Sequence, residues 1–381
     1  MVSMSPFGTI AGRVETRPYA THSCLSFKTH PPCCCKVRAD DSRSSRFPAM
    51  SRTERKQPDA AIEKLAAAVR DGDRRALARA ITRVESTRPE HQDEAQALLA
   101  LLLPATGKAI RIGISGPPGV GKSTFIEAFG LYLIKQGHRV AVLAVDPSSP
   151  RSGGSILGDK TRMEELARNP AAYIRPSPTG GTLGGVARRT REAGLVCEAA
   201  GFDVVLIETV GVGQSETAVA EMVDLFMLIL PPAGGDELQG LKKGIVELAH
   251  LIVVNKADGD LAAAAGRAVS EYRAALHLLR SATPDWSPPI VKVSAMLRQG
   301  MDEVWREIER FRATLGPARL RTRRAAQAKA WMWNEIEEGL LALLRHDPHV
   351  AASLPELEKK VLQGHMTPAA AARTILAAFR G

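Results

Sequence analysis

The sequence is poor in cysteine, in aromatic residues and in long apolar runs. Its 381 residues include five cysteines, and four of these lie within the first fifty positions. A single cysteine in the remaining chain, Cys197, excludes a disulfide framework and fits a reducing compartment. No apolar run approaches the roughly 20 residues that span a membrane, so we expect no membrane segment.

The sequence also lacks any long run of residues with the same charge. The formal net charge of +10 is spread thinly, although residues 1–50 carry seven lysines and arginines against three acids. Without a run of like charge to mark a nucleic-acid arm, we expect no nucleic-acid partner. A basic surface that partly complements an acidic ligand or partner is the better interpretation.

Residues 1–49 mix Pro, Ser, Thr, Cys and Arg without periodicity, which predicts disorder. Three interpretations are open: a leader due to a wrongly assigned start before Met50, a transit peptide, or a metal-binding tail around Cys33–Cys35. We favour the first, because Asp40 and Asp41 are atypical of transit peptides and no C-x-x-C spacing is present. We therefore expect a cytoplasmic protein, or a mitochondrial matrix protein if residues 1–49 are a real transit peptide.

After this leader the pattern predicts three parts: a helical extension over 50–106, an α/β domain over 107–315 and a helical arm over 316–381. In the first part Asp73 and Asp93 are expected to begin helices, the second of which covers 95–103. Near-continuous apolar strands separated by helices indicate a mostly parallel sheet buried on both faces. The predicted strands are 110–114, 139–145, 204–207, 225–230, 251–254 and 290–293. The predicted helices of the arm are 317–345, 355–363 and 367–379.

The strongest motif follows the first predicted strand and opens a helix. It reads Gly116, Pro117, Pro118, Gly119, Val120, Gly121, Lys122, Ser123 and Thr124. This is the phosphate-binding P-loop in its required strand–helix context. Its glycines let backbone N–H groups wrap around phosphates, Lys122 adds a positive charge, and the Ser123 hydroxyl is a magnesium ligand.

A second motif, Asn255-Lys256-Ala257-Asp258, follows the predicted strand 251–254. The Asp258 carboxylate suits the N1–H and 2-amino donors of guanine, whereas adenine would leave the charge unpaired. Asn255 is expected to tie this loop to the P-loop. Residues Ser294, Ala295 and Met296, after the last predicted strand, suit the loop that contacts the guanine oxygen.

Acidic residues follow two further strands. Glu208 is expected near magnesium through water, and Gly211 near the γ-phosphate. Val212 stands where signalling switches carry a water-positioning glutamine. Asp146 and Asp159 are magnesium-side candidates, with helix caps or solvated acids as the alternative. The glycine-dense stretches 180–185 and 234–244 are either mobile elements of the site or plain linkers.

Five segments in this order resemble the methylmalonyl-CoA mutase-associated GTPases, formerly described as arginine/ornithine-transport kinases. They begin at Asp146 (DPSS), Gly153 (GGSILGDKTRM), Arg175 (RPSPTGGTLGG), Glu208 (ETVGVGQSE) and Asp236 (DELQG). The resemblance covers roughly residues 58–345. It implies a P-loop α/β domain with helical N- and C-terminal extensions, and a homodimer built by the C-terminal arm.

The resemblance also implies a metallochaperone that docks on adenosylcobalamin-dependent methylmalonyl-CoA mutase and gates loading, protection and reactivation of its B12 cofactor. The cobalamin adenosyltransferase is a further implied partner. The cofactors implied are GTP or GDP with Mg²⁺, and B12 only through the partner. Asp146 and Asp159 then lie in switch I, Glu208 in switch II, and Gln239 and Lys242 in a third, partner-sensing switch. The implied catalytic set is Lys122, Glu208, Gln239 and Lys242.

Two other functions compete with this hypothesis. A kinase of an arginine/ornithine transport system would need a base beside the γ-phosphate, and no separate catalytic-loop motif is present. A nickel-insertion GTPase would need histidines or cysteines near the P-loop, where the core offers only Cys197 and scattered histidines.

In the arm, Trp331, Trp333, Ile336, Leu340 and Leu344 follow helical spacing, which predicts either packing on the chain's own domain or a dimer contact.

Overall fold

The computed structural model describes residues 59–145, 163–176, 183–209, 215–232, 243–277, 283 and 285–380. The chain divides into two compact units, Met1–Arg55 and Lys56–Gly381, and all the described residues belong to the second unit. The predicted leader 1–49 and the candidates Asp146, Asp159, Gln239 and Lys242 lie outside the described residues. None of the described helices is long and apolar enough to cross a membrane.

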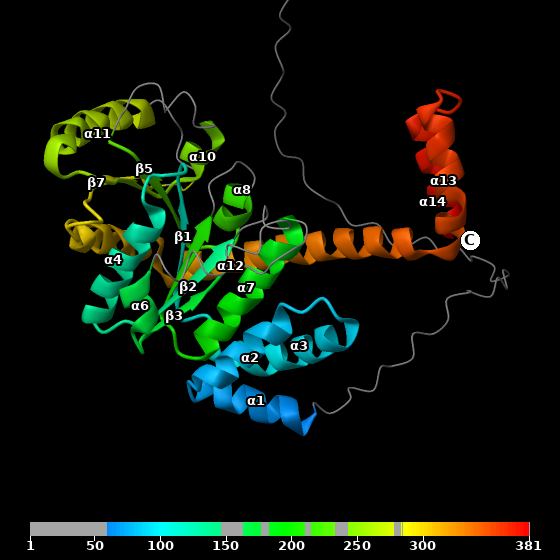
Figure 1. Ribbon diagram of the computed structural model, residues 1–381, viewed down its shortest axis with the longest axis horizontal. Coiled ribbons are helices and arrows are strands. Elements are labelled where there is room, and N and C mark those ends of the chain that lie inside the picture. The colour runs from blue at the N-terminus through cyan, green and yellow to red at the C-terminus, as the bar shows by residue number, and fades with distance from the viewer. Residues whose placement is uncertain are drawn as a thin grey trace, which may run out of the picture. The chain divides into compact units, whose positions relative to one another are not determined.

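A seven-stranded, all-parallel sheet forms the centre of the described chain (Figure 1). Its strands are β1 (Ile110–Ser115), β2 (Val140–Val145), β3 (Ala172–Arg175), β4 (Val204–Thr209), β5 (Leu225–Leu230), β6 (Leu251–Val254) and β7 (Ile290–Lys292), in the spatial order β3-β2-β4-β1-β5-β6-β7. The predicted fold class and the six predicted strands are confirmed. The prediction missed β3, a four-residue edge strand of which only Ala172 is buried.

Helices cover both faces of this sheet, and the strands alternate their side chains between them. Even-numbered β1 residues such as Ile112 and Ile114 pack with Phe125 and Phe129 on one face. The other faces of β2, β4 and β5 pack against α1–α3, α7, α8 and α10. The helices are α1 (Ala60–Arg70), α2 (Arg74–Val84), α3 (Pro89–Leu102), α4 (Lys122–Lys135), α6 (Glu164–Arg168), α7 (Leu183–Ala199), α8 (Ser215–Ala220), α10 (Lys243–Leu248), α11 (Ala262–His277), α12 (Met301–His346), α13 (Pro348–Leu362) and α14 (Pro368–Arg380), with 3₁₀ turns at Leu103–Ala105 and Gly259–Leu261.

The first three helices share one core with the sheet. Asp73 caps α2, as predicted, by accepting hydrogen bonds from the N–H groups of Arg75 and Ala76 at 2.7 and 2.8 Å. The prediction for Asp93 was wrong, because α3 begins at Pro89 and Asp93 lies inside it. Proline at the first helical position is well tolerated, and this start signal outweighs a possible cap four residues later.

Helix α12 begins on the sheet and continues into the arm. Gly316 interrupts it with φ 66° and ψ 166°, a conformation that favours glycine, and Pro317 restarts it. The predicted start of the next helix at 355 was wrong, since α13 begins at Pro348, capped by Asp347, and contains Pro355.

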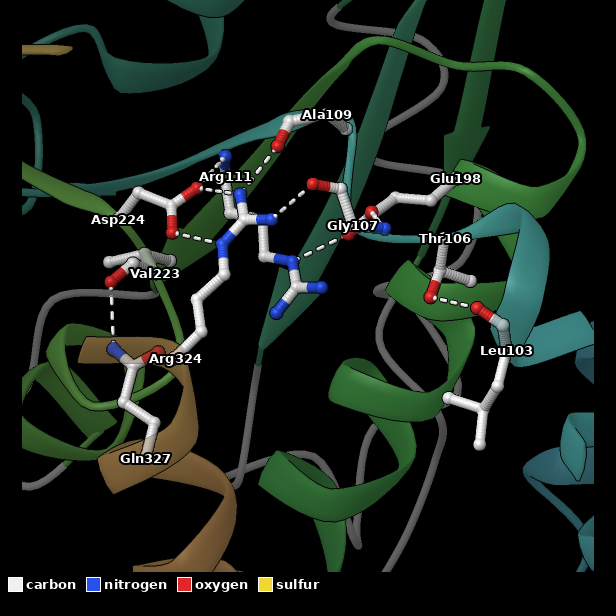
Figure 2. A network of polar contacts seen from close by, with 10 residues as sticks. All are labelled: Leu103, Thr106, Gly107, Ala109, Arg111, Glu198, Val223, Asp224, Arg324 and Gln327. Carbon is white, nitrogen blue, oxygen red and sulfur yellow. Dashed lines mark hydrogen bonds and ion pairs between the residues drawn. The ribbon is translucent and has the colours of Figure 1, made fainter. Parts of the chain in front are cut away.

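A polar network anchors α12 just beyond this break, as Figure 2 shows. The guanidinium of Arg324 donates to both carboxylate oxygens of Asp224, at 2.8 and 2.5 Å, and to the carbonyls of Gly107 and Ala109, at 2.7 and 2.6 Å. Asp224 also accepts from the N–H of Arg111 at 2.9 Å. Gly107 and Ala109 precede β1, and Asp224 precedes β5. The bonds from Arg324 therefore tie α12 to the amino ends of these two central strands.

A buried histidine in the same region makes stability depend on pH. His250 is 4% exposed; its Nδ1 accepts the Phe226 N–H at 3.0 Å, and Nε2 lies 3.0 Å from the Thr283 hydroxyl. Burial, and then the charge of Arg323, lower the pKa of His250 from 6.5 to about 3. Below pH 6.5 His250 is protonated in the unfolded chain, whereas in the folded chain it stays neutral until the pH approaches 3. Stability contributed by this residue is therefore lost as pH falls from 6.5 towards 3.

We expect His250→Asn, which keeps an acceptor for Phe226, to flatten this dependence. Between pH 6 and pH 4 the slope of unfolding free energy against pH should fall by about 1.4 kcal/mol per pH unit, the contribution of one proton. Urea unfolding at several pH values measures the slope. An unchanged slope in the variant would show that His250 is not the group that titrates.

Candidate nucleotide site

The carboxyl ends of β1, β4, β6 and β7 bring the described candidate residues to one edge of the sheet. In parallel α/β sheets ligands bind at this edge, where neighbouring connections leave in opposite directions. In the strand order β3-β2-β4-β1-β5-β6-β7, the chain passes from β1 to β2 on one side of β1 and from β4 to β5 on its other side. The P-loop that follows β1 therefore opens at the switch point of the sheet.

The P-loop has the backbone shape that its glycines allow. Gly116 has φ 156°, and a Cβ there would lie 2.2 Å from the carbonyl oxygen of Ile229 on β5. Gly121, at φ 90°, precedes α4, and a Cβ there would lie 2.8 Å from Asn255 Nδ2. Any larger residue at either position would displace the loop. The loop then leads into the N-terminus of α4, whose free N–H groups and dipole favour phosphate.

Lys122 opens α4 and is 9% exposed. Its Nζ donates to the carbonyls of Gly116 and Pro117, at 2.9 and 3.2 Å. Burial lowers the pKa of Lys122, while the charges of Glu208 and Glu216 oppose that shift. The Lys122 ammonium thus lies against the backbone of the P-loop, and the charges of the buried Glu208 and Glu216 act on it.

Ser123 and Glu208 bring two hard oxygen ligands together. The Ser123 hydroxyl donates to Glu208 Oε1 at 3.2 Å, and Glu208 is 8% exposed at the end of β4. A hydroxyl beside a carboxylate, next to a phosphate loop, fits the oxygen chemistry that Mg²⁺ prefers. Behind them the buried Thr209 hydroxyl donates to Ser115 Oγ at 2.9 Å and braces β4 against β1.

Asn255 links three loops of the site. Its side chain, 1% exposed, donates to the Val120 carbonyl at 2.9 Å and accepts the Ala295 N–H at 3.1 Å. The predicted contact with the P-loop is therefore present, and Asn255 reaches the loop after β7 as well. Lys256, in the left-handed region at φ 59°, donates from Nζ to the Gly119 carbonyl at 2.8 Å.

The remaining guanine-side candidates lie around Asn255. Asp258 is half-buried directly before the turn Gly259–Leu261, and the Ala257 N–H donates to the Val293 carbonyl at 2.9 Å. The buried Ser294 accepts the Leu297 N–H at 3.2 Å on its side-chain oxygen, whereas Met296 is 79% exposed. Asp258 and the loop 294–297 thus follow the neighbouring strands β6 and β7, at the same edge of the sheet as the P-loop.

Sequence reasoning missed two features of this site. It gave no role to Glu216, which is 3% exposed in the first turn of α8 and whose charge acts on Lys122. It also missed the Ser115–Thr209 hydrogen bond. The only available signal was the position of both residues at motif borders, because their burial depends on the tertiary fold.

Together, the parallel sheet, the P-loop and the Asn255 loop define a P-loop NTPase of the GTPase class. Comparison with known families agrees: the model described as "Methylmalonyl Co-A mutase-associated GTPase MeaB" matches residues 77–349. The chain belongs to this family, as the five sequence segments predicted, and it is an enzyme that hydrolyses GTP.

Relatives match over most of their length. A protein of Caulobacter vibrioides named as a GTPase is 59% identical over 309 residues, covering 81% of this chain and 94% of its own. The mouse "Methylmalonic aciduria type A homolog, mitochondrial" is 51% identical over 330 residues, covering 84% and 80%. A crystal structure named as an LAO/AO transport system kinase is 39% identical with a TM-score of 0.69, covering 85% and 99%.

Proposed function

We propose that the carboxyl edge of the sheet binds GTP through the residues described above. The backbone of residues 116–121 and Lys122 hold the phosphates, while Asp258 accepts the N1–H and 2-amino hydrogens of guanine. Ser294, Ala295 and Met296 line the side of the guanine oxygen. Asn255 acts indirectly, by holding the phosphate loop and both base loops in register.

Magnesium would be held by the Ser123 hydroxyl, with Glu208 contacting it through water, and would neutralise charge on the β- and γ-phosphates. We also place Asp146 and Asp159 on the magnesium side, from their sequence positions. In hydrolysis, water attacks the γ-phosphorus, the bond to the β–γ bridging oxygen breaks, and GDP leaves. Lys122 and the α4 N-terminus stabilise the charge that develops on these oxygens.

We further propose that the protein is a GTPase chaperone of the methylmalonyl-CoA mutase system. In this role it docks on the adenosylcobalamin-dependent mutase and gates loading, protection and reactivation of its B12 cofactor. The observation that supports this is the family match over residues 77–349, together with the mouse relative's name. Gln239 and Lys242 would sense the partner, and the cobalamin adenosyltransferase would be a further partner.

Co-purification tests the docking step. Tagged protein loaded with a non-hydrolysable GTP analogue should retain purified methylmalonyl-CoA mutase, whereas Lys122→Met, which lacks the lysine charge at the phosphates, should retain less. A control with Lys135→Met, an exposed lysine at the end of α4, should match the wild type. No retention of the mutase in any nucleotide state would contradict the proposal.

We also propose that the arm forms a homodimer. Its middle part exposes large apolar side chains, each at least 40% exposed: Met332, Trp333, Ile336, Leu340, Leu341 and Leu343. Trp331 and Leu344, predicted on the same face, are half-buried instead. Exposed apolar patches of this kind mark interaction surfaces, and their place on one helix suits pairing with a second copy.

Charge substitution on this face should produce a monomer. Removing the arm at residue 315 is a poorer test, because it also removes Arg324 and leaves the carboxylate of Asp224 without its main partner. We expect Leu340→Glu combined with Leu343→Glu to halve the mass measured by light scattering. Lys329→Glu, an exposed position nearer the sheet on the same helix, should leave it unchanged. A dimer that survives the double substitution would place the interface elsewhere.

A further inference from the structure

Two tryptophans on α12, two positions apart, have different surroundings. Trp333 is 53% exposed, whereas Trp331 is half-buried with the Arg191 guanidinium 4.1 Å from its ring centre. A cation over an indole face is the most favourable geometry for a cation–π contact. Trp331 therefore belongs to the contact between the arm and its own domain, not to the exposed face.

An ionic cluster around Arg191 continues this contact along α7. Arg188 lies 3.0 Å from Glu335 of α12 and 3.6 Å from Glu192. Glu192 in turn accepts a hydrogen bond from Gln96 of α3 at 3.1 Å, and burial raises the pKa of Glu192. Helix α7 is thus held between the amino-terminal helices and the arm.

Helix α8 meets the arm at the same place. Ala218 of α8 and Met222, two residues beyond its end, line a cavity of about 250 Å³ together with Arg191, Trp331 and Leu341. The opposite end of α8 carries Glu216, buried in its first turn, whose charge acts on Lys122. Since α8 has six residues, this rigid element spans only about 9 Å between the nucleotide site and the arm.

Helix α8 also lies close in the chain to the end of β4, which carries Glu208. Helix α7 begins at Leu183, inside the glycine-dense stretch 180–185, and α8 begins at Ser215, seven residues after Glu208. Because Glu216 lies in the first turn of α8, a shift of α8 moves the carboxylate whose charge acts on Lys122. Packed helices move as units rather than deforming continuously.

We infer that Trp331 is a positioning residue for GTP hydrolysis. Through Arg191 it holds α7, and through the cavity that it lines together with Ala218 it holds α8, whose first turn carries the buried Glu216. The inference rests on the nucleotide site proposed above and does not involve the mutase. It makes the arm part of the GTPase mechanism as well as a dimer surface.

Steady-state hydrolysis by the full chain alone, without mutase, tests this role. Trp331→Ala should lower kcat about three- to tenfold with KM for GTP within about twofold, because the phosphate and base contacts stay in place. Trp331→Phe keeps an aromatic face for Arg191 and should restore kcat to within about twofold of the wild type. Arg191→Met should lower kcat similarly, and the double variant should fall no further than either single one.

Trp333→Ala provides the matched control, since it removes an indole from the exposed face of the same helix. Its kcat should stay near that of the wild type even if light scattering shows a change in oligomeric state. Equal loss of kcat in Trp333→Ala would overturn the positioning role, as would a Trp331→Ala protein that melts at a lower temperature but turns over normally. Failure of the nucleotide site itself is distinguishable, because Lys122→Met would then hydrolyse GTP normally.

Discussion

Asp258→Asn is expected to exchange the nucleotide preference of the protein from guanine to xanthine. The Asp258 carboxylate would accept two hydrogen bonds from guanine, and bonds to a charged group contribute about 1.5–3 kcal/mol each. Losing both should weaken GDP binding by about 10²–10⁴-fold. The new amide donates to the 2-oxo group of xanthine, so xanthosine diphosphate should then bind more tightly than GDP.

Calorimetric titration of both diphosphates into the wild type and the variant measures this exchange. Asp260→Asn is the matched control, because Asp260 is an exposed acid two positions further along the same turn. The affinity of Asp260→Asn for GDP should stay within about twofold of the wild-type value, because removing one surface charge has only a small effect. Comparable affinity of the wild-type protein for ATP and GTP would refute the base assignment.

Lys122→Met is expected to cause the largest loss of turnover, about 10³-fold or more in kcat. Lys122 is a buried positive charge that donates to two carbonyls of the phosphate loop. Removal of one group that stabilises transition-state charge costs about 10²–10³-fold. An additional loss is expected because Glu208 and Glu216 would lose their buried cation. Phosphate release under saturating GTP measures the effect, and Lys135→Met should retain wild-type turnover.

A second variant separates catalysis from folding. Ser123→Ala removes the hydroxyl that donates to Glu208 but leaves Lys122 and the charges unchanged. It should keep the wild-type melting temperature within a few degrees, while kcat falls and the magnesium concentration needed for half-maximal rate rises. Wild-type magnesium dependence in this variant would contradict the ligand role of Ser123.

The sequence predicts the central sheet well because its strands are buried on both faces and read as short apolar runs. β5, whose six residues are all buried, is the clearest example. β3 escapes prediction because a four-residue edge strand with three partly exposed side chains has no such run. The helix starts at Pro89 and Pro348 are missed for a local reason, because proline ends helices elsewhere but is favoured at the first helical position.

The P-loop and the Asn255 loop are predictable because short motifs define their chemistry. The Asn255–Val120 hydrogen bond follows from that chemistry once both loops lie at one edge of the sheet. By contrast, the Arg324–Asp224 pair and the Arg191–Trp331 contact join residues that lie far apart in the chain, on elements that are not neighbours in sequence. No local pattern distinguishes Arg324 from its neighbours Arg321 and Arg323.

The most direct test of the central claim is the GTPase rate with and without purified methylmalonyl-CoA mutase. Because Val212 replaces the water-positioning glutamine, we expect slow basal hydrolysis; groups supplied by partners raise turnover about 10³–10⁵-fold in other switches. We predict that the mutase raises the wild-type rate by about tenfold or more, and that Lys242→Ala keeps its GTP affinity but loses the rise. A Lys242→Ala protein stimulated as strongly as the wild type would show that Lys242 does not sense the mutase. A wild-type rate unchanged by saturating mutase would contradict the proposed chaperone function itself.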